Sequence, residues 1–316
     1  MDKQLMDRRR FLHASLSAAT CAGLLSASRL SIALDTGTKS KADEKSARKI
    51  NVGMHVWVYA KHQPDYDVYG ILSDIWADVK YAGLDGIELM EQPLRRQDKT
   101  REIAELIEAH RLPLIGTSYG ANFWDKAESN RIYDDLANIL TNMQVLSART
   151  IGVSVGKPQN RDKTEQEFDA QADLIQRTQA LALEHGVVLN LHNHTYEVEK
   201  QLFDLKNTLK RIPDIPLGPD INWLVRAGVE PNAFLKQYQD NIVFLHLRDQ
   251  HASGAWAESI GEGDTDFTKL GHTLDAINFK GDAIIELAHE DGFTPTRPIK
   301  ESLKMSRAHI RNTLGF

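Results

Sequence analysis

Cysteine is almost missing from this sequence, and long apolar runs are missing altogether. The 316 residues contain one cysteine, Cys21, so no disulfide can form within the chain and a disulfide-stapled scaffold is excluded. No apolar run in the body of the protein reaches the about 18 residues that a membrane-spanning helix requires. Positive charge is also in the minority, because the 38 lysine and arginine residues are outnumbered by 44 aspartate and glutamate residues. The resulting net charge of −6 argues against nucleic acid as the main partner.

The N-terminus has the composition of an export signal. Arg8, Arg9 and Arg10 are followed by Phe11 and Leu12 and then by a mildly apolar stretch rich in alanine, serine and leucine. The Arg-Arg-x-Phe-Leu pattern resembles the twin-arginine export signal, although a basic helix start in a cytosolic protein is an alternative. We therefore predict a twin-arginine-type signal peptide over residues 1–33, a flexible tether over 34–48 and one domain over 49–316. The mature protein would be periplasmic or otherwise exported, with no stable membrane insertion after cleavage.

From residue 50 onward, short apolar runs alternate with longer amphipathic stretches. The predicted strands are residues 50–58, 86–90, 113–117, 150–155, 187–192, 217–220, 242–247 and 283–287. The predicted helices are residues 69–82, 100–110, 130–146, 165–185, 200–211, 231–238, 266–277 and 299–314. Eight strand–helix units in about 267 residues predict a parallel (β/α)₈ TIM barrel. A doubly wound open sheet is the alternative, but no glycine-rich phosphate loop follows the first strand.

Polar residues stand at the ends of the later strands, where a barrel of this kind carries its catalytic groups. Side chains alternate along a strand, so Asn190, His192 and His194 share one face and would be costly in a dry core. Packing could explain one such histidine, but two of them at this spacing favour ligands or hydrogen-bond donors at the barrel mouth.

Each of the next three predicted strands also carries one acidic or imidazole group. Asp220 ends the sixth strand, where it could also be a helix cap; His246 follows an apolar run, and Glu286 lies inside one. Two imidazoles and two carboxylates suit Mn²⁺, Co²⁺ or Zn²⁺ better than Ca²⁺, with Mg²⁺ as a further option. The sequence therefore predicts a divalent metal site.

Five motifs in this order resemble one known family. They are residues 186–194 (GVVLNLHNH), 220–228 (DINWLVRAG), 244–249 (FLHLRD), 261–267 (GEGDTDF) and 284–286 (IIE). Together they resemble the sugar phosphate isomerase/epimerase family of xylose-isomerase-like TIM barrels, over roughly residues 50–311. The resemblance implies a divalent ion held by His192, Asp220, His246 and Glu286. Many members have a glutamate where His192 stands, so this chain is more similar to a His-Asn-His subgroup.

The same resemblance, together with the expected strand ends, predicts a set of catalytic and substrate-binding residues. Glu286 and His194 are the candidate acid/base groups. The expected substrate-binding residues are His55, Trp57, Glu88, Tyr119, Trp124 and Arg248. Arg248 could instead pair with Asp249 or Asp220.

We expect a small-molecule partner, a neutral sugar or glycoside, because phosphorylated sugars are mostly cytoplasmic and the expected mouth of the barrel has no cluster of lysine and arginine for a phosphate. The predicted reaction removes the proton next to the carbonyl of a keto-sugar through an ene-diolate, as in isomerases and epimerases. Elimination of the C1 substituent from a 3-keto-glycoside, a lyase reaction, is the alternative, and an exported sugar-binding protein without turnover is the third. The endonuclease IV branch of the same fold fits poorly with the acidic balance. The family resemblance also allows a homo-oligomer.

Overall fold

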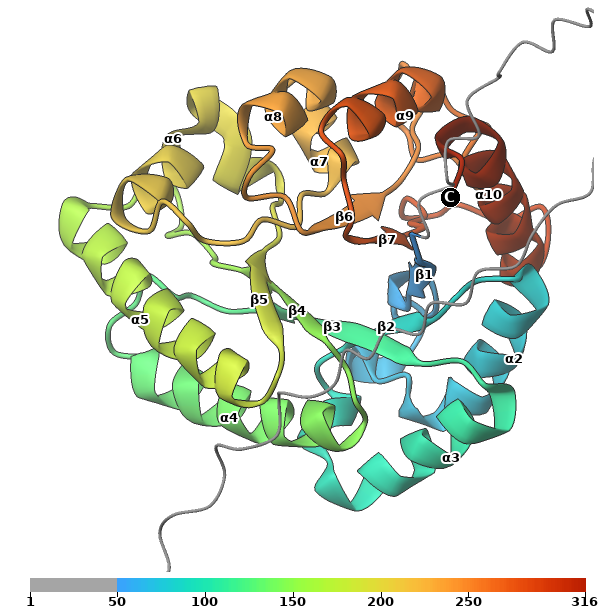
Figure 1. The fold of residues 1–316 in the computed structure, drawn as a ribbon, viewed down its shortest axis with the longest axis horizontal. Coiled ribbons are helices and arrows are strands. Elements are labelled where there is room, and N and C mark those ends of the chain that lie inside the picture. Colours follow the sequence, from blue (N-terminus) through green and yellow to red (C-terminus); the bar gives the residue numbers. More distant parts are fainter. Residues whose placement is uncertain (1–49) are drawn as a thin grey trace, which may run out of the picture. The chain divides into compact units, whose positions relative to one another are not determined.

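The computed structural model describes residues 50–316, and Figure 1 shows a sheet surrounded by helices. The predicted signal peptide over residues 1–33 and the tether over 34–48 lie outside the described residues and stay predictions. Among the described helices, none combines the length and the hydropathy needed to cross a bilayer.

Seven parallel strands form the wall of the barrel. In chain order they are β1 (Val52–His55), β2 (Ile87–Met90), β3 (Leu114–Gly120), β4 (Thr150–Ser154), β5 (Val188–Leu191), β6 (Phe244–Leu247) and β7 (Asp282–Ile285). Their order in the sheet is β5-β4-β3-β2-β1-β7-β6, and every pair is parallel. The TIM-barrel prediction is confirmed.

The predicted sixth strand, residues 217–220, forms only isolated bridges between β5 and β6. Leu217 bridges to Leu191 on one side and to Ile242 on the other, and Asp220 bridges to His246. A regular strand is not possible here because Pro216 and Pro219 have no N–H to donate. We call this segment, residues 217–220, the seam of the barrel.

The side chain of Asn193 completes the pairing at the seam. Its Nδ2 donates to the carbonyl oxygen of Asp220 at 3.3 Å, and its Oδ1 accepts the Asp220 N–H at 3.2 Å. One amide side chain thus supplies the donor and the acceptor that a neighbouring strand would have supplied.

Ten α-helices occur in the described part of the chain, most of them outside the barrel (Figure 1). They are α1 (Trp57–Ala60), α2 (Leu72–Ala82), α3 (Thr100–His110), α4 (Ser129–Val145), α5 (Glu165–Glu184), α6 (Thr195–Arg211), α7 (Ile221–Arg226), α8 (Pro231–Gln237), α9 (Phe267–Ala276) and α10 (Ile299–Leu314). Short 3₁₀ turns span Pro64–Tyr66, Tyr69–Ile71, Pro93–Arg95 and Gln97–Lys99.

Local sequence explains where several of these helices begin and end. Helix α5 begins at a capping box, in which the Thr164 side chain accepts the Glu167 N–H and the Glu167 side chain accepts the Thr164 N–H. Helix α2 ends at Gly83, whose φ of 72° is the left-handed conformation that glycine adopts without steric cost.

The structure differs from the predicted elements in several places. The apolar run over residues 50–58 contains β1 and then α1, rather than one long strand. Helix α6 begins at Thr195, and a kink at residues 199–202 separates its first turn from the part that the prediction over 200–211 covers. Helix α7 was not predicted. Helix α7 starts directly after Asp220, and α6 starts three residues after His192, so the predicted metal site lies where strands give way to helix N-termini.

Candidate active site and metal centre

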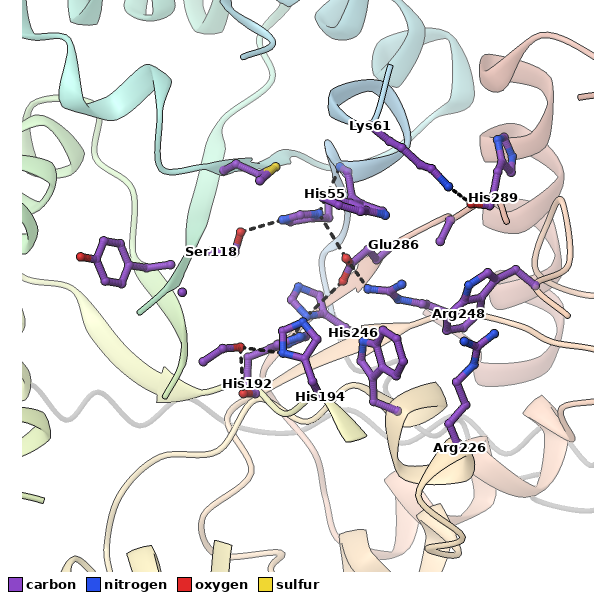
Figure 2. A pocket seen from close by; sticks show the side chains of 18 of the residues that line it. His55, Lys61, Ser118, His192, His194, Arg226, His246, Arg248, Glu286 and His289 are labelled. Atoms are coloured by element: carbon purple, nitrogen blue, oxygen red, sulfur yellow. Dashed lines mark hydrogen bonds and ion pairs between the residues drawn. The ribbon is translucent and has the colours of Figure 1, made fainter. Parts of the chain in front are cut away.

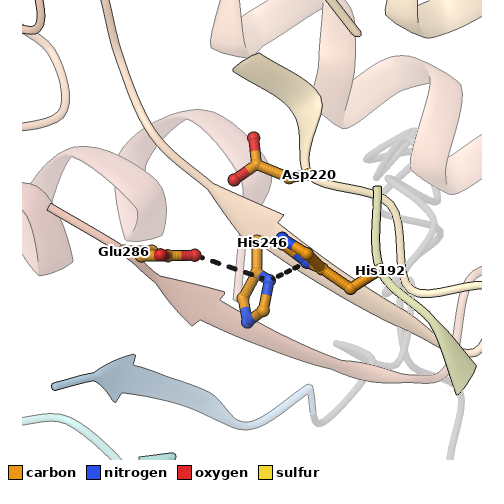
Figure 3. Close-up of side chains that lie close together, drawn as sticks. All are labelled: His192, Asp220, His246 and Glu286. Atoms are coloured by element: carbon orange, nitrogen blue, oxygen red, sulfur yellow. Dashed lines mark hydrogen bonds and ion pairs between the residues drawn. The ribbon is translucent and has the colours of Figure 1, made fainter. Parts of the chain in front are cut away.

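Four buried side chains from neighbouring segments meet at the carboxyl-terminal end of the barrel (Figure 3). His192 follows β5, Asp220 ends the seam, His246 belongs to β6, and Glu286 follows β7. Each offers one possible ligand atom, and these atoms all lie within 4.8 Å of one another. The structure thus brings together the four residues that the sequence singled out.

The nitrogen and oxygen atoms that converge in this cluster fit a divalent cation. The Nδ1 atoms of His192 and His246 face each other at 2.7 Å. Glu286 Oε2 lies 3.6 Å from His246 Nδ1 and is buried without a hydrogen-bond partner. Converging imidazole nitrogens and a carboxylate oxygen without a donor are the ligand set that Mn²⁺, Co²⁺ and Zn²⁺ accept.

Asp220 has two roles in this region. Its Oδ1 accepts the N–H groups of Asn222 at 2.8 Å and Trp223 at 3.0 Å, and so caps α7. Its Oδ2 lies 2.8 Å from Arg248 Nε. Burial raises the pKa of the Asp220 carboxyl, although the Arg248 charge opposes this effect.

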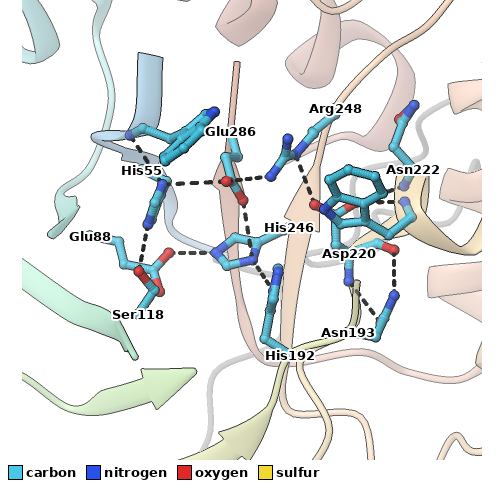
Figure 4. Close-up of polar contacts among 12 residues, drawn as sticks. His55, Glu88, Ser118, His192, Asn193, Asp220, Asn222, His246, Arg248 and Glu286 are labelled. Carbon is cyan, nitrogen blue, oxygen red and sulfur yellow. Dashed lines mark hydrogen bonds and ion pairs between the residues drawn. The ribbon is translucent and has the colours of Figure 1, made fainter. Parts of the chain in front are cut away.

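Arg248 neutralises part of the negative charge of the cluster. Its guanidinium forms ion pairs with both Asp220 and Glu286 and is almost fully buried (Figure 4). Burial alone would raise the pKa of Glu286, but Arg248 and the nearby histidines hold it well below its usual value. Glu286 is therefore ionised at neutral pH. Asp249, the other partner expected for Arg248, instead accepts the N–H groups of Gly261 and Gly263.

Glu88 lies behind His246 and is fully buried. Its Oε2 is 2.5 Å from His246 Nε2, on the opposite side of the ring from the facing Nδ1 atoms (Figure 4). Burial lowers the pKa of His246, but the Glu88 and Glu286 charges outweigh it and raise the pKa to about 9. A carboxylate on the distal nitrogen orients a metal-ligating imidazole and increases its basicity. Glu88, expected to bind substrate, is thus placed as a support for His246.

His194 and His55 lie on the wall of the cavity at either side of the cluster. His194 Nδ1 is 3.1 Å from Ser154 Oγ, and burial on the cavity wall lowers the pKa of His194 to about 4. Its imidazole is therefore neutral at neutral pH and able to accept a proton. His55 Nε2 is 2.9 Å from Ser118 Oγ, and its Nδ1 is 3.5 Å from Glu286 Oε1.

A cavity of about 490 Å³ opens above the cluster (Figure 2). Of the predicted site residues, His55, Trp57, Tyr119, His192, His194, His246, Arg248 and Glu286 line it. Trp124 is not among the lining residues, and its ring instead lies 5.8 Å from the Arg161 guanidinium carbon. The Tyr119 hydroxyl donates to Asp135 at 3.0 Å, so its ring rather than its hydroxyl is available to a ligand.

Sequence reasoning missed several lining residues. They are Lys61, Ser118, Trp223, Arg226, Trp256 and His289. All except Ser118 lie in the segments that follow a strand or the seam, so listing every polar or aromatic residue in those segments would have found them.

The comparisons with known proteins agree with this architecture. Residues 76–309 match the family model described as xylose isomerase-like TIM barrel, whereas no curated protein sequence matches the chain. A sugar phosphate isomerase/epimerase from Parabacteroides distasonis is similar in structure over 87% of this chain and 97% of its own, with 16% identity and a TM-score of 0.66. D-psicose 3-epimerase is similar over 84% and 100%, with 13% identity and a TM-score of 0.68. The 3-keto-D-glucoside 4-epimerase from E. coli is similar over 84% and 100%, with 16% identity and a TM-score of 0.63. At these identities the likeness to solved structures shows a shared fold.

Proposed function

Because this chain belongs to the xylose isomerase-like TIM barrel family, we propose that it is a divalent-metal-dependent enzyme that isomerises or epimerises a neutral keto-sugar. The observation that carries the proposal is the buried cluster of His192, Asp220, His246 and Glu286 at the floor of a cavity. The sugar epimerases among the similar structures support the same reaction class.

The side chains around the cluster divide the chemical work. A divalent ion bound by the four ligands would polarise the sugar carbonyl and stabilise the negative charge that develops when the neighbouring carbon loses its proton. Glu286 is held ionised by Arg248, and His194 is held neutral by burial, so either can accept that proton at neutral pH. Return of the proton to the opposite face of the carbon would complete an epimerisation.

Charge pairing around the cavity supports a neutral substrate. Lys61 pairs with Asp291 at 3.0 Å, Arg226 pairs with Glu290 at 3.0 Å, and Arg248 pairs with the two carboxylates of the cluster. A phosphate group binds where cationic side chains are free to contact it. All lysine and arginine side chains that line this cavity already have a carboxylate partner.

A lyase acting on 3-keto-glycosides is the second candidate, because the cavity continues past the cluster to Arg226 and His289. In that reaction a base takes the C2 proton, the C1–C2 double bond forms, and the C1 substituent leaves with the bonding electron pair and then takes a proton. Export through residues 1–33 would place either enzyme outside the cytoplasm. Fusion of these residues to a reporter that functions only after twin-arginine export tests that placement.

Proton NMR in D₂O of the metal-loaded protein with a 3-keto-glucoside tests the function. Deuterium at the carbon next to the carbonyl in an intact glycoside is expected for an epimerase or isomerase, whereas an unsaturated keto-sugar and a released aglycone identify the lyase. Glu286→Gln should abolish either signal while the protein remains folded, and the exposed residue Glu184 provides the matched control Glu184→Gln. Sugar binding without either signal, across several keto-sugars, would leave a binding protein and refute the enzyme proposal.

A further inference from the structure

His289 lies in the segment after β7, and its ring has no hydrogen-bond partner. The residue is only 6% exposed, and both Nδ1 and Nε2 are buried without a partner. A neutral imidazole presents one N–H donor and one lone-pair acceptor. Buried polar atoms are almost always paired. Two unpaired ring nitrogens of His289 on a cavity wall therefore indicate a ligand that carries a hydrogen-bond donor and an acceptor.

The backbone around His289 is fixed on both sides. The Lys61 ammonium donates to the carbonyl oxygen of His289 and also pairs with Asp291 at 3.0 Å. Glu290, between them, pairs with Arg226 at 3.0 Å. The His289 ring packs on Phe293 with 4.7 Å between centroids and 31° between planes. The imidazole is therefore held in place before any ligand arrives, which lowers the entropic cost of binding.

Three tryptophans, Trp57, Trp223 and Trp256, line the same cavity as His289. Trp223 meets Trp256 edge to face at 5.4 Å, and the Arg226 guanidinium lies 3.5 Å from the Trp256 ring centroid. The indole Nε1 of Trp223 is buried without a partner, as are the ring nitrogens of His289. Trp57 stacks on Tyr66 at 5.4 Å. These side chains offer flat apolar surfaces and a small number of polar atoms, the usual lining of a site for a ring-shaped ligand.

His289 lies away from the metal-binding cluster, whereas the Trp223 ring reaches back toward it, with its centroid 5.5 Å from that of His194. Figure 2 shows His289 and Arg226 on the other side of Arg248 from His192 and His194. The cavity of about 490 Å³ falls in the range of about 300–1,000 Å³ that holds ligands of drug size. It therefore has room for more than the one sugar ring that the cluster would engage.

We propose that Trp57, Trp223, Trp256 and His289 form an outer subsite for a second, hydroxylated ring attached to C1 of the reacting sugar. The substrate is then a glycoside and not a free monosaccharide. Ring hydroxyls of the C1 substituent occupy the free valences of His289 and Trp223, and the charge pairing of Lys61 and Arg226 makes the subsite suited to an uncharged group. This inference rests on the proposed function, because it places the reacting sugar at the cluster.

The test measures binding of glucosides that have no keto group and so do not react. Calorimetry would compare methyl β-D-glucoside with cellobiose, whose second ring is a sugar, and with 4-hydroxyphenyl β-D-glucoside, whose second ring is a phenol. At least one two-ring ligand should bind the metal-loaded protein about tenfold or more tightly than the methyl glucoside. The ligand with the larger ratio identifies the kind of ring.

His289→Ala should reduce that ratio to about one-tenth of its wild-type value, and His289→Gln, which keeps a donor and an acceptor, should restore part of it. His272→Ala, at an exposed position of α9, is the matched control and should keep the ratio. Equal affinity for one-ring and two-ring ligands in the wild type, or an unchanged ratio in His289→Ala, would overturn the inference.

The two proposals fail separately in these experiments. Deuterium exchange in a 3-keto-glucoside, with no preference for a second ring, would support the enzyme proposal and refute the outer subsite. A strong preference for two-ring ligands that depends on His289, without deuterium exchange or elimination, would support the outer subsite and refute the enzyme proposal.

Discussion

Replacement of Glu88 by glutamine tests whether this buried carboxylate controls the metal site through His246. Glu88 Oε2 contacts His246 Nε2 at 2.5 Å, so it keeps a proton on that nitrogen and leaves the Nδ1 lone pair for the cluster. Glutamine has nearly the same shape but no charge. It can accept from Nε2–H through its oxygen, but it no longer increases the basicity of the ring.

The expected effect is a loss of divalent-metal affinity by about 10- to 100-fold, the range found when a partner of a metal-ligating histidine is changed. This loss equals about 1.4–2.8 kcal/mol of binding free energy. The free energy of unfolding of the metal-free protein should change by less than this loss of binding free energy. The reason is that Glu88 Oε1 is buried without a hydrogen-bond partner and the substitution removes a buried charge. The pKa of His246 should fall, since the largest charge that raises it is gone.

Competition with a chromophoric chelator measures the affinity for Zn²⁺ and Mn²⁺, and near-ultraviolet circular dichroism checks the fold. Glu184→Gln, at an exposed position of α5, makes the same chemical change away from the site and should bind metal as the wild type does. A folded Glu88→Gln protein with metal affinity within about twofold of the wild type would refute the role assigned to Glu88.

Three further changes test stability. Lys163→Met should destabilise the protein by about 3–5 kcal/mol in urea unfolding, because it leaves Asp204, now 2.6 Å from the Lys163 ammonium, as a buried charge without a cationic partner. The double variant with Asp204→Leu should recover most of the loss, and additive effects of the two substitutions would contradict this. Burial raises the pKa of the Glu197 carboxyl from 4.5 to about 8, so the folded state keeps a proton that the unfolded state releases, and stability should fall as the pH rises from about 4.5 to 8. Glu197→Gln should flatten that part of the stability–pH curve, and an equally steep curve in the variant would reject the assignment. Gly116→Ala should cost at least about 1–3 kcal/mol, because its Cβ would lie 2.2 Å from the Thr150 carbonyl oxygen, whereas Gly120→Ala on the same strand meets nothing within 4 Å and should be nearly neutral in thermal unfolding.

Periodic patterns with clear end signals predicted the fold well. Helix α3 occupies residues 100–110 and α10 occupies 299–314, as the amphipathic spacing predicts. The run over residues 50–58 failed because Val56, Trp57 and Val58 continue the apolar pattern into a four-residue helix. Hydropathy cannot separate a strand from a short buried helix. Helix α7 was missed for the related reason that six residues are too few to show a period.

The candidate site was likewise predictable from the sequence only in part. Each member of the metal cluster interrupts or ends an apolar run, so a local pattern was enough to select His192, Asp220, His246 and Glu286. The role of Glu88 depends on a partner 158 residues away, which no local pattern contains. His289 and Trp256 lie in segments without periodicity, and only the folded chain shows that they line the cavity.

The seam has a mechanical consequence. Between β5 and β6 the barrel wall is joined by bridges at Leu217 and Asp220 and by the Asn193 amide, so it is the segment of the wall with the least regular pairing. His192 and His246 stand on opposite sides of this segment, and Asp220 stands within it. An ion bound by His192, Asp220 and His246 would connect β5, the seam and β6, and so would hold the two edges of the sheet together. Removal of the ion should therefore accelerate amide hydrogen exchange along residues 217–220 before it affects β2 or β3, because the barrel wall should open first at the seam.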